Sequence, residues 1–202
     1  MSDVPAEVHE YAEQAVAYVR RALSLTLEYD SETLPILDHY LRGVPQDEGA
    51  AAELIVVTAG AYFGEVVRRR LGGRWELGEE PRRWRVVLPA GLNFAPAGLA
   101  AAAIVGAELA DLDTQLDAPP RMRGHLQDAL ARMGDVSEDA YFSLCGRLDT
   151  LEHLHEVLVT VAAQLLGDAG DPEDGGGDGD GDEDGDGDDE VDPGVKLDER
   201  LN

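Results

Sequence analysis

One histidine in the sequence has the spacing from a glutamate that a metal site would use. Glu152 and His155 form a Glu-x-x-His pair, which is half of the motif that holds a carboxylate-bridged di-metal centre in helical bundles. A complete site needs a second copy of the pair and two more glutamates, which a dimer could supply. The alternative is a hydrogen-bonded core histidine, because His155 also falls on an apolar helical seam. We predict no metal site and keep weak metal binding as a third functional hypothesis.

A second candidate for metal chemistry lies in the acidic segment 180–188. Its alternating aspartates match the first nine positions of an EF-hand loop, with Gly185 in the sixth place. The twelfth place, where calcium needs a bidentate glutamate, is Val191, and Glu190 comes one position early. Because repeats of Asp and Gly produce such matches by chance, the segment predicts at most weak and diffuse binding of divalent cations.

Because Cys145 is the only cysteine, the chain can form neither an intramolecular disulfide nor a Cys-based zinc site. It falls on the apolar face of a predicted helix, so we expect an inert, packed thiol. The sequence has no Gly-rich phosphate loop and no Ser/His/Asp or Cys/His arrangement that would support nucleophilic catalysis. We therefore predict a protein that is not an enzyme and has no cofactor.

Charge divides the chain into a body and a tail. The 202 residues include 42 acidic and 16 basic side chains, for a formal net charge of −26. Such acidity argues against direct binding of nucleic acid, which needs a basic face. Residues 168–194 hold 14 acidic residues and nine glycines, and such a segment cannot bury enough apolar surface to fold. We predict a folded domain over 1–167, a disordered acidic linker over 168–194 and a short C-terminal segment over 195–202.

Arginines gather between Glu65 and Arg85, where seven arginines accompany four glutamates. We call this stretch the arginine island. One interpretation is a solvated face that is neutralised within the hairpin and by a Glu65–Arg69 pair four residues apart. The other is a docking surface for the acidic tail or an anionic partner. The candidate partner-binding residues are Arg68, Arg69, Arg74, Arg83, Arg85, Leu197 and Leu201.

Three helices are predicted in the N-terminal part from apolar residues at helical spacing. They cover residues 5–28, 32–42 and 47–71. Asp30 or Ser31 can cap the second helix, and Gly43 ends it. The third contains the uncharged run 54–64, so we expect it to be buried on every side.

Glycines mark how this third helix packs and where it ends. Gly60 and Gly64 lie on one face and predict close contact with another backbone, which would offset the cost of glycine inside a helix. Gly72 and Gly73 supply a C-terminal stop.

A hairpin follows, with strands over 74–77 and 82–88 joined by a turn over 78–81. Glu76 is expected on the outer face with Arg83 and Arg85, which is a favourable cross-strand arrangement. The alternation directs the remaining side chains to the core, including both tryptophans: Trp75, Leu77, Trp84, Val86 and Leu88. We expect the two indoles to cover a solid interior around Gly60, with no room for a reaction centre.

The second half is predicted to be helical. A small-residue helix over 96–112 carries Gly98, Ala102 and Gly106, which would let another helix approach closely. The remaining helices are predicted over 121–133 and 136–166, and Asp135 with Glu138 fits a capping box for the latter.

The last predicted helix carries an apolar seam with alternating steps of four and three residues, as in coiled coils. The seam consists of Leu144, Leu148, Leu151, His155, Leu158, Ala162 and Leu165. About 30 residues would reach roughly 45 Å, so one end either protrudes or meets a partner helix. The alternative is a helix packed along the first and third helices.

Residues 60–77 read GAYFGEVVRRRLGGRWEL. This run resembles bacterial domains of unknown function in which a buried helix with a Gly-x-Tyr-x-Gly-Glu pattern leads through Gly-Gly-x-Trp into a hairpin. The matching positions are Gly60, Tyr62, Gly64, Glu65, Gly72, Gly73 and Trp75. The resemblance covers roughly residues 10–160 and implies helices around a small sheet, and it implies no activity.

Two features bear on location. The N-terminal sequence has neither a basic nor an apolar signal-peptide region. The uncharged run 86–107 is long enough to cross a bilayer, but prolines, glycines and alanines make a buried strand, loop and helix the better interpretation. We predict a cytoplasmic protein without a membrane partner.

Together these features predict a mostly helical α+β fold, with about six helices around one antiparallel hairpin and a disordered acidic tail. The leading functional hypothesis is a non-catalytic, acidic, adaptor-like protein that binds another protein. Self-association through the 136–166 helix stays open. The alternative hypothesis is an inhibitor or immunity-type protein that neutralises a basic toxin or a nucleic-acid-binding enzyme.

Overall fold

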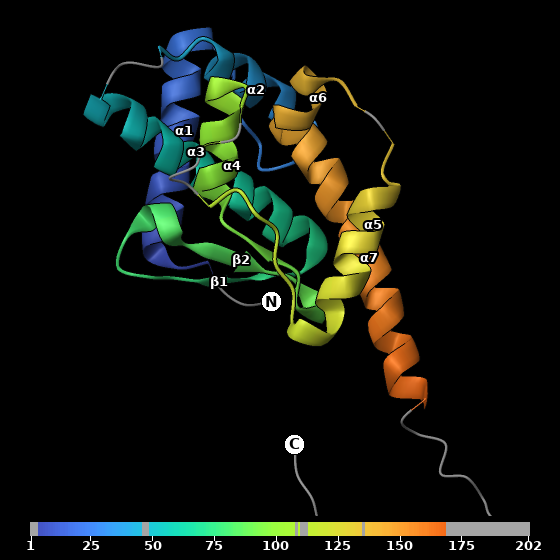
Figure 1. Ribbon diagram of the computed structural model, residues 1–202. Coiled ribbons are helices and arrows are strands. Elements are labelled where there is room, and N and C mark those ends of the chain that lie inside the picture. The colour runs from blue at the N-terminus through green and yellow to red at the C-terminus, as the bar shows by residue number, and fades with distance from the viewer. Residues whose placement is uncertain (1–3, 46–48, 108, 110–112, 135, 169–202) are drawn as a thin grey trace, which may run out of the picture. The chain divides into compact units, whose positions relative to one another are not determined.

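The computed structural model describes residues 4–45, 49–107, 109, 113–134 and 136–168. The predictions for the acidic linker after Asp168, which ends α7, and for residues 195–202 lie outside them. These described residues form seven helices and a three-stranded antiparallel sheet (Figure 1). The helices are α1 (Ala6–Leu23), α2 (Leu34–Arg42), α3 (Gly49–Leu71), α4 (Pro96–Val105), α5 (Arg123–Arg132), α6 (Glu138–Phe142) and α7 (Leu144–Asp168). The strands are β1 (Arg74–Glu76), β2 (Arg85–Val87) and β3 (Asn93–Phe94), and short 3-10 turns are η1 (Pro81–Arg83), η2 (Pro89–Gly91) and η3 (Pro120–Met122). The predicted mostly helical α+β class is confirmed.

Helix α3 is the central element, as its uncharged sequence predicts. Every residue from Val56 to Arg68 is buried, and α1 and α4 pack along it. The helix ends at Gly72, whose φ of +78° favours glycine and whose N–H donates to the carbonyl of Arg68. α3 is also long and apolar enough to cross a membrane. The buried core helix of a globular protein can have the same length and composition, so these two properties do not distinguish the two cases.

Gly60 makes the predicted close approach to another backbone. A Cβ at this position would lie 2.6 Å from the Cα of Ala97, so α3 and α4 meet at a distance that only glycine allows here. Gly64 faces the Trp75 ring and Pro96 instead, so its predicted backbone contact is replaced by side chains. The interior around Gly60 is therefore filled by α4.

The two strands of the hairpin are antiparallel, as predicted, but they are shorter than predicted, and a third strand joins the sheet. β1 and β2 are antiparallel with Glu76 opposite Arg85, and β3 adds to the far edge of β2. Residues 81–83 form η1 rather than strand, so Arg83 does not join the cross-strand group. Trp84 is buried against Tyr11 of α1, Trp75 is half-buried, and Leu77 is exposed, contrary to its predicted core position.

Gly98 contacts a chain segment and not a helix, which corrects the prediction for α4. A Cβ there would lie 2.0 Å from the carbonyl oxygen of Asp113, in the stretch that runs back beside β3. Gly106 has open space around it and instead ends α4 with a φ of +69°. The small residues of α4 thus admit α3 on one side and an extended segment on another.

The buried faces of the first two helices follow the predicted spacing, but α1 ends at Leu23 and not at residue 28. Val8, Ala12, Ala15 and Val19 form the buried face of α1. The N-cap of α2 is Thr33, which makes no side-chain capping bond, so the predicted cap at Asp30 or Ser31 is wrong. The Asp30 carboxylate instead accepts the backbone N–H of Thr33 at 2.9 Å and fixes the turn before the helix. Gly43 is the C-cap of α2, as predicted.

The predicted helix 136–166 is broken at Ser143 into α6 and α7. Ser137 caps α6 by accepting the N–H of Ala140, and this corrects the predicted cap at Asp135, a residue outside the described range. α7 packs on α2, α5 and α6, with lesser contact to α3 and α4, rather than along α1 and α3 (Figure 1). Of its predicted seam, Leu144, Leu148, Leu151 and Leu158 are buried, whereas Leu165 is exposed.

Candidate functional site

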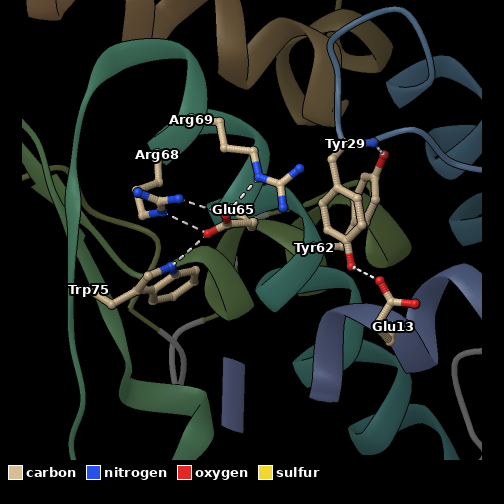
Figure 2. A network of polar contacts seen from close by, with 7 residues as sticks. All are labelled: Glu13, Tyr29, Tyr62, Glu65, Arg68, Arg69 and Trp75. Atoms are coloured by element: carbon tan, nitrogen blue, oxygen red, sulfur yellow. Dashed lines mark hydrogen bonds and ion pairs between the residues drawn. The ribbon is translucent and has the colours of Figure 1, made fainter. Parts of the chain in front are cut away.

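A buried carboxylate, Glu65, organises the first polar cluster (Figure 2). Its side chain is only 2% exposed and accepts the Nε–H of Arg68 at 2.8 Å and that of Arg69 at 2.7 Å. The indole N–H of Trp75 donates to the same carboxylate at 3.3 Å. Burial alone would raise the pKa of Glu65, but these three donors outweigh it and hold the pKa below its ordinary value. The carboxylate is therefore an ionised structural anchor between α3 and β1.

Two stacked tyrosines extend this cluster towards α1. The rings of Tyr29 and Tyr62 lie 4.8 Å apart, and the Arg69 guanidinium lies 4.3 Å above the Tyr29 ring (Figure 2). The Tyr29 hydroxyl donates to Glu13 at 2.7 Å, and its backbone N–H donates to the Tyr62 hydroxyl at 2.9 Å. Tyr29 has a φ of +58°, a strained conformation that these contacts hold in place. Burial, followed by the contact with Glu13, raises the pKa of Tyr29, so the group stays neutral.

Each arginine of the island lies against a carboxylate, and Arg68 and Arg69 share that of Glu65. Arg74 pairs with Glu76, Arg83 with Glu80, and Arg85 with Asp113. Arg70 and Arg82 reach Glu152 and Glu53. The predicted Glu65–Arg69 pair is confirmed. All seven cations of the island are thus compensated within the body, as the first interpretation of this stretch expects. Leu197 and Leu201 lie outside the described residues.

Glu152 and His155, the candidate metal pair, make other contacts. Glu152 pairs with Arg70, and burial lowers the pKa of His155, whose ring lies near the carbonyl of Pro89. Across the part of the chain that the structure describes, no three His, Cys, Asp or Glu side chains are placed to hold a metal ion together.

Asp38 performs a role that the sequence pattern does not reveal. This buried α2 carboxylate accepts the N–H of Leu144 at 2.7 Å and that of Cys145 at 3.1 Å. These are N–H groups of the first turn of α7, which have no partner within their own helix. Asp38 therefore caps a helix that begins 106 residues later in the chain.

Cys145 lies in a setting that keeps its thiol protonated. Burial, together with the hydrogen bond and charge of Asp38, raises the pKa of the thiol to about 12. We expect the native protein at pH 8 to react with iodoacetamide at least about a hundredfold more slowly than the urea-unfolded chain, because only the thiolate attacks. Rates measured by mass spectrometry test this, and similar rates in both states would contradict it.

A groove lies elsewhere, between α5, α6, the first turns of α7 and residues 114–117. Its volume is about 930 Å³. Most of its lining is apolar, and the main apolar side chains are Leu116, Leu126, Leu130, Met133, Val136 and Tyr141. Asp117 and Arg123 pair with each other at the groove at 3.0 Å. Gly60 is not among the residues that line it.

Arg147 is the unusual residue of this groove. It is 6% exposed, and its Nε and Nη2 atoms have no hydrogen-bond partner. The guanidinium lies 4.0 Å from the centre of the Tyr141 ring and 5.7 Å from that of Phe142. Cation–π contact thus replaces the carboxylate that buried arginines normally require.

Sequence reasoning missed this groove. The available signal was Arg147 itself, which follows Leu144 by three residues and precedes Leu151 by four, beside the predicted apolar seam. A single arginine near the start of a helix is usually a surface residue, so its burial depends on the break at Ser143 that places α6 over it. Comparison with models of protein families, with curated proteins and with solved structures finds no match to the chain, so the family resemblance stays a prediction and the site stands on its geometry.

Proposed function

We propose that this chain is a non-catalytic, adaptor-like protein that binds another protein through the C-terminal half of α7. The observation that carries the proposal is a run of exposed apolar side chains at this end of the helix. Val159 and Leu165 are 41% and 42% exposed, and Leu166 is 72% exposed. Soluble surfaces seldom leave several large apolar side chains together on one helix without a partner.

The spacing of this face suits a helical partner. Val159, Ala162 and Leu166 follow one another in steps of three and four, which places them on one side of α7 beside Leu165. Steps of this kind form the seam along which two helices pack. We call these four residues the α7 face.

The charges beside the α7 face indicate what the partner carries. After Arg147, α7 contains no lysine or arginine, whereas Asp149, Glu152 and Glu156 are acidic. Glu152 already pairs with Arg70, and Asp149 and Glu156 are exposed. A partner helix with lysine or arginine beside its apolar seam would complement these groups, and a second copy of α7 would repel them. We therefore favour a basic amphipathic helix of a different protein over self-association.

The chemistry of the body supports a non-catalytic function. The Cys145 thiol is held neutral, and the buried Glu65 carboxylate is occupied by three donors. We place the protein in the bacterial cytoplasm as part of this proposal. The acidic linker would keep the body soluble or present residues 195–202 to a partner.

An inhibitor or immunity-type function is the second candidate. The ion pairs of the arginine island favour this function, because the arginines are neutralised by carboxylates and the rest of the surface carries an excess of acidic groups. Glu7, Glu10 and Glu13 are exposed on α1, and Glu28 and Glu32 are exposed in the segment that follows. Such a surface would attract a basic enzyme at long range, and that attraction would weaken with added salt.

A synthetic helix of leucine and lysine in heptads tests the α7 face. We expect the full-length protein to bind this peptide in calorimetry at low salt, and the V159E/L166E double variant to bind it at least tenfold more weakly. L25E, which changes a 48% exposed leucine outside α7, is the matched control and should bind like the wild type. Sedimentation velocity on the wild type should show a monomer.

Two results would overturn the proposal. Equal binding by V159E/L166E and the wild type would remove the α7 face as the site. A wild-type dimer that V159E/L166E dissociates would show that the face joins two copies of this chain and not a different protein.

A further inference from the structure

His155 lies where α7 makes its last contacts with the rest of the domain. The helix packs against η2, and the ring of His155 lies near the carbonyl of Pro89 in that turn. Leu158, less than one turn later, is buried, whereas no residue from Val159 to Leu166 is buried. The contact between His155 and η2 therefore lies at the end of the attached part of α7.

The Nδ1 atom of His155 is enclosed without a partner. It has almost no surface exposed to water, and within the described part of the chain it has no hydrogen-bond partner. A neutral imidazole carries one proton, so one nitrogen can stay bare, but a second proton would make both nitrogens donors. Protonation in place would thus bury a charge and an unpaired donor together, which is costly.

The groups around His155 do not offset that cost. Burial lowers its pKa, the carbonyl of Pro89 opposes this only in part, and no charged side chain of the described residues contributes. η2 and α4 contain no ionisable side chain, and Glu152 of α7 is paired with Arg70 of α3. Asp38 of α2 binds the first amides of α7, about three turns before His155. The ionisable groups of α5 and α6 that carry full charges are exposed: Arg123, His125, Asp128, Arg132, Glu138 and Asp139.

The contact with η2 is also one that can open locally. His155 as a whole is only half-buried, so a small movement of α7 would bring its ring into water. Ala90, the residue after Pro89, has a φ of +63°, a strained conformation for a residue with a Cβ that persists only where neighbouring contacts hold it. Separation of α7 from η2 would let this strain relax.

We propose that His155 is a pH-operated latch, in which the neutral ring holds the C-terminal half of α7 on η2 and protonation releases it while the rest of the domain stays folded. Once released, His155 takes up a proton near its ordinary pKa of 6.5, whereas the enclosed ring does so only at lower pH. The closed latch is therefore fully favoured above pH 6.5. It weakens as the pH falls below that value, by up to about tenfold per pH unit. This latch concerns the attachment of α7 and does not depend on what the α7 face binds.

Hydrogen exchange on the full-length protein at pH 7.5 and pH 5.0 tests the latch. In the wild type, protection factors over residues 155–166 should fall about tenfold on acidification, because a short detached helix is marginal in water. Those of the Leu88 and Gly91 amides, which bond to Leu92 and Leu88, should fall with them. The buried centre of α3 should change by less than about twofold, since Glu65 stays ionised in this range.

Three variants separate the latch from general effects of acid. H155Q is uncharged at both pH values and should keep its protection within about twofold. H155K is charged at both and should show low protection already at pH 7.5. H153Q removes an exposed histidine from the same helix and is the matched control, which should respond to acid like the wild type.

NMR titration of the wild-type ring gives a direct readout that needs no variant to fold. The His155 ring should titrate with a midpoint below 6.5. A midpoint at or above 6.5, unchanged protection in the wild type at pH 5.0, or an equal fall in H155Q would each overturn the latch. A simultaneous loss of protection in α3 would also reject it, because the whole domain would then be opening.

Discussion

Replacing Gly60 by alanine is expected to lower the free energy of unfolding by about 2 kcal/mol. The new Cβ would lie 2.6 Å from the Cα of Ala97 and 2.7 Å from its backbone nitrogen. Because these are backbone atoms of α4, no side-chain rotation can make room, and α3 and α4 must separate. The strain exceeds the roughly 1 kcal/mol that alanine gains over glycine inside a helix. Urea denaturation followed by circular dichroism measures the difference.

Gly124 provides the matched control for this substitution. It lies within α5, and a Cβ there would meet nothing within 4 Å. G124A should therefore raise the free energy of unfolding by about 0.5–1 kcal/mol, through helix propensity alone. If G60A stabilised the protein as G124A does, α3 and α4 would not be in backbone contact.

Replacing Glu65 by glutamine is expected to cost about 3 kcal/mol at pH 7. Glutamine keeps the volume but removes the charge that neutralises the buried Arg68 and also accepts from Arg69 and Trp75. E76Q is the control, because Glu76 and its partner Arg74 are both more than half exposed and such pairs contribute less than about 1 kcal/mol. Equal losses in the two variants would show that the Glu65 cluster is not a stabilising anchor.

The Glu65 cluster also predicts a pH dependence with a definite sign. The pKa of Glu65 in the folded protein is lowered from its ordinary value of 4.5. Its contribution is therefore fully present above pH 4.5 and is lost as the pH falls through the folded pKa. The stability difference between the wild type and E65Q should shrink on acidification below pH 4.5. A difference that stays constant there would contradict the lowered pKa.

Features that depend on local pattern could be predicted from the sequence. The uncharged run through Gly60 indicated a buried helix, the two glycines after Leu71 indicated its end, and alternation around Trp84 indicated a hairpin. β3 escaped prediction because a strand of two residues has no detectable alternation. The break at Ser143 also escaped, because the carboxylate that caps the new helix start belongs to α2.

The site was less predictable than the fold. The arginine island has a clear sequence signal, but the structure shows that its arginines are paired with carboxylates, two of them with the same Glu65. Arg147 has almost no signal in the sequence, because what distinguishes it is its burial under α6 without an ion pair. Composition shows which charges a chain holds, but which of them lack a partner depends on tertiary packing.

The contact between Asp38 and the start of α7 has a consequence for biosynthesis. Ribosomes deliver α2 well before α7, so the acceptor for the first amides of α7 exists while that helix is still being translated. Contacts of such long sequence separation slow folding, because a large loop must close before they form. We expect the N-terminal helices to assemble first and α7 to join last, docking onto a carboxylate that is already in place.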